Sequence, residues 1–122
     1  MLTALDLNRG EIAWQVPLGE GSAALHNHPL LKGVALPDRL GSPNSRGGAM
    51  VTRSGLVFIG GGDGYLYAFD KKTGKEIWRG KVPYENAAVP MTYRTRSGRQ
   101  FIAVATGTGA NNALVAFALR GN

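Results

Sequence analysis

The sequence ALDLNRGEIAW (residues 4–14) returns 64 positions later as AFDKKTGKEIW (residues 68–78), with Asp, Gly and Trp in matching places. A third and shorter copy, LVAFA, occupies residues 114–118. A repeat at intervals of tens of residues predicts stacked supersecondary units, because a single unit of this size cannot bury its apolar face alone. The architecture of the chain therefore depends on what one unit folds into.

The most complete copy of the unit spans residues 47–83 and has the pattern of four short strands. Its apolar or mixed runs, at residues 48–52, 56–59, 65–69 and 75–79, alternate with turns that contain glycine. Turns of this length between such runs predict antiparallel hairpins. Apolar residues do not recur at helical spacing over three turns anywhere in the sequence. The sequence therefore predicts an all-β fold made of four-stranded antiparallel sheets.

The pattern of the strands favours a β-propeller over a β-sandwich. The inner strands predicted at residues 100–105 and 114–119 are apolar on both faces, as expected for a sheet that is covered on both sides. A sandwich of irregular strands is the alternative, but it does not require the repeated Asp-x-x-x-Gly-x-x-x-Trp spacing. We predict one partial β-propeller domain of about two and a quarter four-stranded blades. It comprises the end of one blade (1–19), a complete blade (47–83) and a blade without its outer strand (88–119).

Composition excludes several classes of protein. The chain has 122 residues and no cysteine, which excludes a disulfide framework and a thiolate metal site. It has no apolar run long enough to span a membrane, and Met1 leads directly into a strand, so we expect neither a transmembrane segment nor a signal peptide. A monomer would leave apolar sheet faces and strand edges uncovered. We therefore expect a homo-oligomer, or association with the remainder of a propeller.

The net charge of +6 is concentrated in turns that should share one rim of the blades. These turns hold Arg9, Arg53, Lys71, Lys72, Lys75, Arg94, Arg96 and Arg99. A basic rim suits an anionic partner such as a membrane surface or a nucleic acid. Solvated turns that merely keep the protein soluble are the alternative. No aromatic residues are interleaved for base stacking, so we expect no nucleic-acid partner.

The opposite rim should collect the longer and more glycine-rich loops. These loops are residues 19–46, 60–64, 83–88 and 107–112. Their glycines would allow a ligand to approach the backbone closely, or would serve only as tight turns with positive φ. Asp63 is the one carboxylate on a glycine-rich tip of this rim, and turn propensity explains it equally well.

The sequence contains no recognisable catalytic constellation. His26 and His28 have the His-x-His spacing of metal ligands on a strand, but no third ligand is near in sequence and Pro29 favours an irregular loop. The glycine run at residues 60–64 lacks the following helix and lysine of a phosphate-binding loop. We therefore assign no catalytic residue and no metal ligand.

Six stretches form an ordered set of motifs along almost the whole chain: residues 2–19, 41–44 with 47–48, 55–60, 73–78, 90–93 and 115–119. In this order they resemble the C-terminal part of pyrroloquinoline quinone (PQQ)-dependent sugar and alcohol dehydrogenases. The resemblance is strongest to the membrane-type glucose dehydrogenase branch. The resemblance implies an eight-bladed propeller with PQQ near its axis, a Ca²⁺ or Mg²⁺ ion on the cofactor, and a periplasmic location.

The resemblance also implies roles for single residues. Trp14 and Trp78 would dock neighbouring blades, and Asp63, Gly107 and Thr108 would lie near the cofactor. The chain departs from the family at this last loop. Alcohol-oxidising relatives have Trp at the position of Thr108, and the glucose branch has His at the position of Gly109.

The resemblance places the metal ligands and the catalytic Asp of the family outside these residues. We therefore expect a propeller segment of a dehydrogenase for sugars or alcohols that is inactive alone. One alternative is a self-associating half-propeller that serves as a scaffold or protein-binding module. Another is a blade-repeat protein of the outer-membrane assembly type, although the match through residues 90–93 opposes it.

Overall fold

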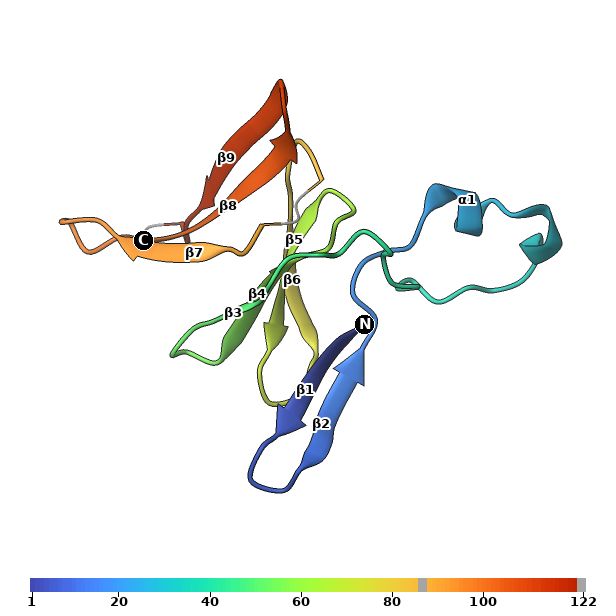
Figure 1. Cartoon of the computed structure of the whole chain (residues 1–122), viewed down its shortest axis with the longest axis horizontal. Helices are drawn as coiled ribbons and strands as arrows, with labels where there is room; N and C mark the ends of the chain where they lie inside the picture. The colour runs from blue at the N-terminus through green and yellow to red at the C-terminus, as the bar shows by residue number, and fades with distance from the viewer. Residues whose placement is uncertain (86–87, 121–122) are drawn as a thin grey trace.

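The computed structural model of the chain describes residues 1–85 and 88–120 and consists of three antiparallel sheets (Figure 1). The first sheet pairs β1 (Leu2–Asp6) with β2 (Glu11–Val16). The second has the order β3 (Met50–Val51), β4 (Leu56–Gly60), β5 (Tyr65–Asp70), β6 (Glu76–Lys81). The third has the order β7 (Met91–Arg94), β8 (Gln100–Thr108), β9 (Asn111–Phe117). Helix in these residues is limited to α1 (Ala23–His26) and a 3₁₀ turn (Pro29–Leu31). The predicted all-β, partial-propeller fold class is confirmed.

The repeated Asp and Gly build the same turn twice. Asp6 Oδ1 accepts hydrogen bonds from two backbone N–H groups of its turn, and Asp70 Oδ1 accepts from the N–H groups of Lys72 and Thr73. Gly10 and Gly74 close the turns at φ values of 69° and 72°, which L side chains rarely adopt. The bonds from Thr73 lower the pKa of the Asp70 carboxyl below its ordinary value. The repeat is therefore a capped hairpin turn.

The repeat also contains a β-bulge that the sequence alone did not indicate. In the second sheet Ala68 pairs with Trp78, whereas the next residue of β5, Phe69, pairs with Glu76. Ile77 is therefore the extra residue, and Ala13 has the same position between Ile12 and Trp14 in the first sheet. A bulge bends the strand and changes which side chains share a face. Glu76 and Arg79, three residues apart, both lie on the face of Tyr67 because of it.

A second internal repeat builds the hairpin turns between the first two strands of the second and third sheets. The sequence Thr-Arg-Ser-Gly occurs at residues 52–55 and again at residues 95–98. In both copies the Thr and Ser hydroxyl oxygens lie 2.9 Å apart. In both, the Gly N–H donates to the Thr carbonyl, at 3.0 and 2.9 Å. This similarity between two sheets is further support for a blade repeat.

The second sheet lies in the middle and is buried on both faces. One face, with Val57, Ile59, Tyr67 and Phe69, packs with Leu18 against the first sheet. The opposite face packs against the third sheet around Phe58, Leu66, Ala68, Val82 and Val104. Burial of both faces explains why β4 and β5 are continuously apolar.

The third sheet differs from the prediction, because only one of its faces is covered. Val104 is 1% exposed on the covered face. On the other face Met91, Tyr93 and Leu114 are 55%, 42% and 74% exposed. No further sheet of the described chain lies against them. The apolar outer face of β7–β9 thus remains open to a partner.

Candidate functional site

The glycine-rich loops meet on one side of the molecule, as the turn directions predict. The β4–β5 turn, the β8–β9 hairpin and the long connection after β2 occupy the upper and right side of Figure 1. Backbone hydrogen bonds link the β4–β5 turn and the β8–β9 hairpin to the segment after β6: Val82 N–H donates to the Gly64 carbonyl (2.9 Å) and Gly107 N–H to the Glu85 carbonyl (2.8 Å). The predicted loop over 83–88 includes residues 86 and 87, which lie outside the described residues. These loops, residues 19–46, 60–64, 82–85 and 107–112, are called the loop rim below.

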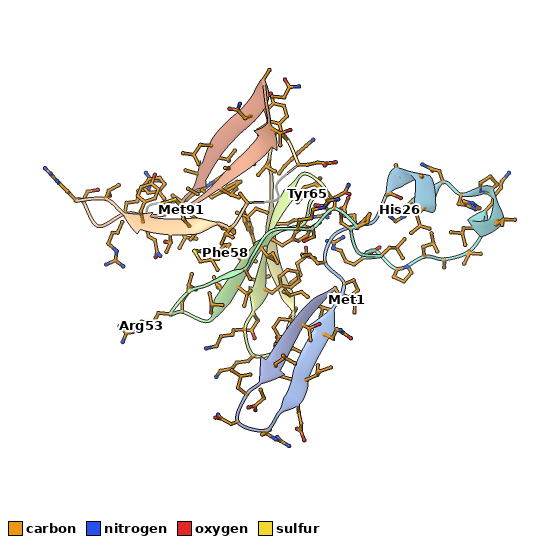
Figure 2. The ribbon with its side chains drawn as sticks, viewed as in Figure 1. Met1, His26, Arg53, Phe58, Tyr65 and Met91 are labelled. Atoms are coloured by element: carbon orange, nitrogen blue, oxygen red, sulfur yellow. The ribbon has the colours of Figure 1, made fainter. Side chains whose placement is uncertain are left out.

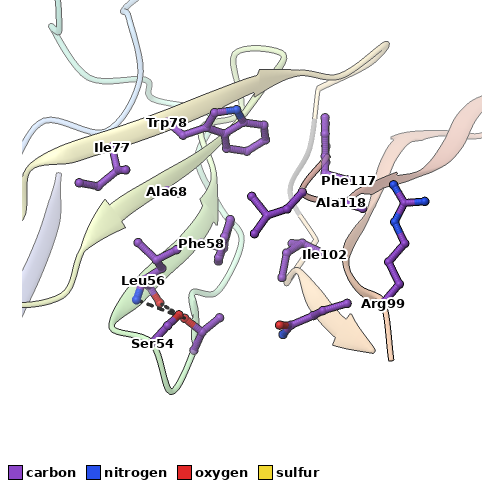
Figure 3. A pocket seen from close by; sticks show the side chains of 13 residues that line it. Ser54, Leu56, Phe58, Ala68, Ile77, Trp78, Arg99, Ile102, Phe117 and Ala118 are labelled. Atoms are coloured by element: carbon purple, nitrogen blue, oxygen red, sulfur yellow. Dashed lines mark hydrogen bonds between the residues drawn. The ribbon is translucent and has the colours of Figure 1, made fainter. Parts of the chain in front are cut away.

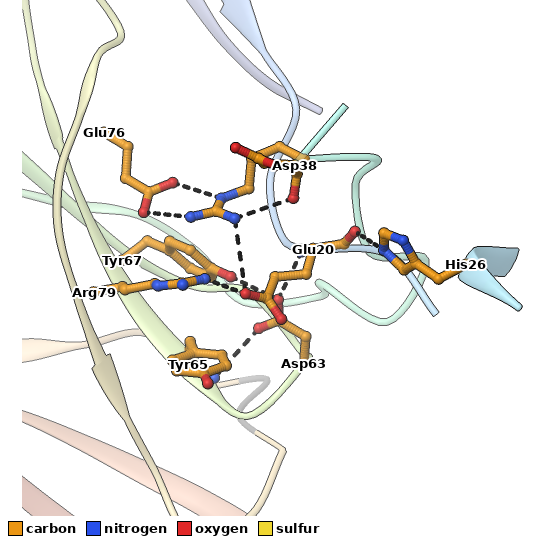
Figure 4. A network of polar contacts seen from close by, with 9 residues as sticks. Glu20, His26, Asp38, Asp63, Tyr65, Tyr67, Glu76 and Arg79 are labelled. Atoms are coloured by element: carbon orange, nitrogen blue, oxygen red, sulfur yellow. Dashed lines mark hydrogen bonds and ion pairs between the residues drawn. The ribbon is translucent and has the colours of Figure 1, made fainter. Parts of the chain in front are cut away.

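Asp63 is the central acceptor of the loop rim (Figure 4). Its Oδ2 accepts from the Glu20 N–H at 3.0 Å and from the Tyr67 hydroxyl at 2.7 Å. Its Oδ1 accepts from the Tyr65 N–H at 3.3 Å. Three protein donors therefore engage this carboxylate, which ties the β4–β5 turn to the long connection.

Tyr67 is the buried donor to Asp63. Its side chain lies in the core and the residue is 0% exposed. Burial raises the pKa of the Tyr67 hydroxyl above its ordinary value, and the hydrogen bond to Asp63 adds to that increase. The raised pKa keeps the Tyr67 hydroxyl protonated into the alkaline range, where it can still donate to Asp63.

A network of charged side chains, which sequence reasoning missed, fastens the long connection to β6. Arg39 donates two hydrogen bonds to Glu76, from Nε at 2.8 Å and from Nη2 at 2.9 Å. Glu20 pairs with Arg79 and lies 3.7 Å from Nη1 of Arg39. The Arg79 guanidinium also lies 5.0 Å from the centre of the Tyr65 ring. A bidentate pair fixes orientation as well as distance.

The network could not have been predicted from the sequence spacing of its four residues, at positions 20, 39, 76 and 79. Residues 20 and 39 lie in an irregular connection, and residues 76 and 79 share a face only through the bulge at Ile77. Part of the network lines a polar hollow of about 450 Å³ beside His26 and Asp38. Glu20, Arg39 and Arg79, which line this hollow, are engaged in ion pairs with one another or with Glu76, so the network acts as a clamp on the connection.

Gly107 has a structural reason to be glycine. Its φ is +77°, and a Cβ placed there would lie 1.9 Å from the Asn111 carbonyl oxygen. Gly107 pairs with Asn112 and Thr108 with Asn111, so the predicted loop over residues 107–112 was too long. Only Gly109 and Ala110 form the turn, because the strand ladder continues past the glycine. Thr108 is exposed, and no hydrogen bond in the described structure joins it to Asp63.

The two histidines are held by local bonds. A ring nitrogen of His26, Nε2, lies 2.8 Å from the Glu20 carbonyl oxygen. Nδ1 of His28 accepts from the Leu30 N–H at 3.3 Å and caps the 3₁₀ turn. Residues 1–85 and 88–120 contain no cluster of three or more His, Cys, Asp or Glu side chains that could hold a metal ion. In the same residues, no helix is long and apolar enough to cross a membrane.

The two tryptophans lie at contacts between sheets. Trp14 of the first sheet donates its indole N–H to the Lys71 carbonyl of the second sheet at 2.8 Å, and its ring covers Gly74. Trp78 packs edge-on against Phe117 of the third sheet, with ring centres 5.1 Å apart. Trp78 also lines an apolar groove of about 430 Å³ between the second and third sheets (Figure 3).

Several known proteins are similar to this chain in sequence and in fold. The sequence model of one family, described as the glucose/ethanol/alcohol dehydrogenase β-propeller domain (PQQ), matches residues 1–102. A probable quinate dehydrogenase (quinone) of Xanthomonas campestris pv. juglandis is 41% identical over 108 residues, 87% of this chain and 13% of that protein. The glycerol dehydrogenase large subunit of Gluconobacter thailandicus is 39% identical over 127 positions, 98% of this chain and 16% of that subunit.

Two further comparisons agree. The quinoprotein glucose dehydrogenase of Escherichia coli (strain K12) is 30% identical over 125 positions, 97% of this chain and 15% of that enzyme. A europium-containing methanol dehydrogenase has a TM-score of 0.61 at 27% identity, over 86% of this chain and 14% of that chain. The chain thus spans 13% to 16% of the length of these curated relatives. It belongs to the PQQ-dependent glucose/ethanol/alcohol dehydrogenase family of β-propeller proteins.

Proposed function

We propose that the chain is a propeller segment of a periplasmic PQQ-dependent dehydrogenase that oxidises sugars or alcohols, and that it is inactive alone. The match of the family model to residues 1–102 is the observation that carries the proposal. Residues 1–19, 47–83 and 88–119 would then be two partial blades and one complete blade of the parent propeller. The small coverage of each relative supports a contribution to a larger active site.

The residues near the proposed cofactor would line its site without supplying its chemistry. When bound, PQQ accepts the hydride that the substrate carbon loses. Three protein donors already engage Asp63, and the Gly107 N–H is bonded to Glu85. Thr108 contributes an exposed hydroxyl. In this proposal the described residues would form part of the wall of a PQQ site, and the Ca²⁺ or Mg²⁺ ligands and the base would come from other blades.

A segment exchange tests the proposal directly. The matching segment of the Gluconobacter thailandicus glycerol dehydrogenase large subunit would be replaced by this chain, and PQQ-dependent oxidation would be measured. We expect the chimera to keep activity within about tenfold of the parent. The same chimera with Gly107→Ala is the control and should lose activity, because that side chain would collide with Asn111. A folded chimera that binds PQQ without oxidising any sugar or alcohol would contradict the proposal.

The isolated chain provides the complementary test. Titration with PQQ and Ca²⁺, followed by quinone fluorescence and thermal shift, should show no tight binding. Assays with sugars and alcohols should show no steady turnover. Saturable binding together with turnover would overturn the claim that the chain is inactive alone.

A second candidate function is a self-associating scaffold or protein-binding half-propeller. The exposed apolar faces favour it: Leu5 and Ile12 of the first sheet are 62% and 60% exposed, and Leu114 of the third sheet is 74% exposed. Such faces are typical of interaction sites. We expect a dimer or larger assembly in sedimentation analysis. A monomeric mass at high concentration would exclude this candidate.

A further inference from the structure

Four hairpin turns form one edge of the molecule, opposite the loop rim. They are the β1–β2, β3–β4, β5–β6 and β7–β8 turns, and their tips follow the lower left side of the view (Figure 1). Arg53 projects from one of these tips, on the side away from His26 (Figure 2). We call this edge the turn rim.

The turn rim holds most of the net charge of the protein. Its eight basic residues, at positions 9, 53, 71, 72, 75, 94, 96 and 99, are all exposed. The acidic residues beside them are Asp6, Glu11, Asp70 and Glu76, and Glu76 is already paired with Arg39. With that pair left aside, eight cations against three carboxylates leave +5 of the total of +6 on this edge. In the network that holds the long connection, by contrast, Arg39 and Arg79 are matched by Glu76 and Glu20.

The cations of the turn rim are largely free of ion pairs. Arg9 pairs with Glu11 at 3.2 Å, between side chains that are 71% and 61% exposed. None of the other seven forms an ion pair with a described residue. Asp6 and Asp70 direct their Oδ1 atoms to the backbone of their own turns. The potential of this edge is therefore not cancelled locally, and it favours an anionic partner.

Exposed aliphatic side chains accompany these charges. Leu7, in the β1–β2 turn, is 88% exposed. Leu119, which follows β9 where that strand returns to the turn rim, is 91% exposed. Cations combined with projecting aliphatic groups suit the boundary between lipid headgroups and acyl chains. A nucleic acid would require aromatic stacking platforms, and the turns contain none.

We propose that the turn rim is a docking surface for an anionic lipid bilayer. The phosphates of the headgroups pair with the Lys and Arg side chains, while Leu7 and Leu119 enter the interfacial layer. The tips of the β1–β2, β3–β4 and β7–β8 turns follow one side of the molecule in Figure 1, so one surface can meet them together. The loop rim then faces away from the membrane, and its glycine-rich loops remain accessible.

Vesicle co-sedimentation of the full 122-residue chain tests this inference. Vesicles of phosphatidylcholine mixed with phosphatidylglycerol are compared with phosphatidylcholine alone. The test variant combines Arg53→Gln, Lys72→Gln and Arg96→Gln. The matched control combines Lys32→Gln, Arg46→Gln and Lys81→Gln, which removes the same charge from exposed positions away from the turn rim. Circular dichroism confirms that each variant keeps its β structure.

We expect binding to the mixed vesicles only. Each cation near an anionic surface changes affinity about fivefold, so the test variant should bind on the order of a hundredfold more weakly while the control changes little. Leu7→Ser should weaken binding further, whereas Leu30→Ser, at an 85% exposed position of the long connection, should not. Salt of about 1 M, where the Debye length is about 3 Å, should release the chain.

Three results would overturn the inference. One is equal loss of binding in the test and control variants, which would show that net charge alone governs it. Another is equal binding to neutral vesicles. The third is preferential binding to polyglutamate or to a single-stranded oligonucleotide over the mixed vesicles, which would assign the surface to a protein or a nucleic acid instead.

Discussion

Substituting Gly74 and Gly10 separately with alanine measures the contact between the first two sheets. The two glycines have the same place in the repeat and nearly the same φ, 72° and 69°. They differ in their surroundings. A Cβ on Gly74 would lie 2.6 Å from Cε3 of Trp14, whereas a Cβ on Gly10 would meet no atom within 4 Å. Gly10→Ala therefore reports the backbone strain, and Gly74→Ala reports the strain plus the collision with Trp14.

The expected difference follows from these distances. A left-handed conformation costs an L residue about 1–2 kcal/mol, partly offset by the lower entropy that alanine gives the unfolded chain. Gly10→Ala should therefore lower the free energy of unfolding by about 1 kcal/mol. At Gly74 the ring must also move, which adds about 1–3 kcal/mol for overpacking. That movement also weakens the 2.8 Å hydrogen bond from Trp14 to Lys71.

Urea denaturation followed by circular dichroism provides the measurement, with the midpoint and the slope fitted separately. The control is Gly74→Ala in a Trp14→Ala background, where the ring is absent. In that background the extra loss should disappear, which gives a coupling energy of about 1–3 kcal/mol between the two positions. Equal losses for Gly10→Ala and Gly74→Ala, or no coupling in the double variant, would refute the assignment of Trp14 to this contact.

Three further predictions concern the loop rim. The raised pKa of Tyr67 means that, above about pH 10, an unfolded chain releases a proton that the folded chain keeps, so the free energy of unfolding falls as pH rises. In urea denaturation at a series of alkaline pH values, Tyr67→Phe should reduce this fall in the free energy of unfolding. The control is Tyr93→Phe, at an exposed position, which should leave the fall unchanged. The same dependence on pH with and without Tyr67 would contradict the prediction. Arg39→Gln removes the ion pair with Glu76, which for partly exposed groups contributes about 1 kcal/mol to holding the long connection in place. Proteolysis within residues 19–46 should therefore become about fivefold faster. An unchanged cleavage rate would show that the pair does not hold this connection. Gly107→Ala should speed amide hydrogen exchange in β8 and β9 far more than Gly109→Ala, because only a Cβ on residue 107 would collide with the backbone of Asn111. Similar exchange rates in the two variants would contradict the close approach at Gly107.

The elements that follow from local chemistry could be predicted from the sequence. Asp70 and Gly74 determine their turn through bonds within five residues, so the spacing alone was enough to predict it. Burial on both faces was predicted for the strands at residues 100–105 and 114–119, and it is wrong there because only one face of the third sheet is covered. The second sheet is the one that is buried on both faces. Trp14 was expected at a contact between blades and does contact the next sheet.

The interactions of the loop rim could not be predicted, because they join residues that are distant in sequence. Asp63 has the propensities of an ordinary turn residue, and only the folded chain brings the Glu20 N–H to its carboxylate. Arg39 meets Glu76 only because the bulge at Ile77 directs that carboxylate to the same side as Tyr67. The assignment of Asp63, Gly107 and Thr108 to a cofactor site stays a prediction.

The contact of Trp14 with the following sheet gives the array a direction. The Asp–Gly turn has two tasks: it closes its own hairpin, and it offers the Lys71 carbonyl and the bare surface of Gly74 to the tryptophan of the preceding unit. In the pair that the structure shows, the tryptophan belongs to the first sheet and its acceptor turn to the second, so the contact is directional. A contact of this kind joins unlike surfaces, the head-to-tail type of association that closes into a ring when the rotation between units permits it. A change at Gly74 is therefore expected to disturb Trp14 of the preceding sheet as well as its own turn.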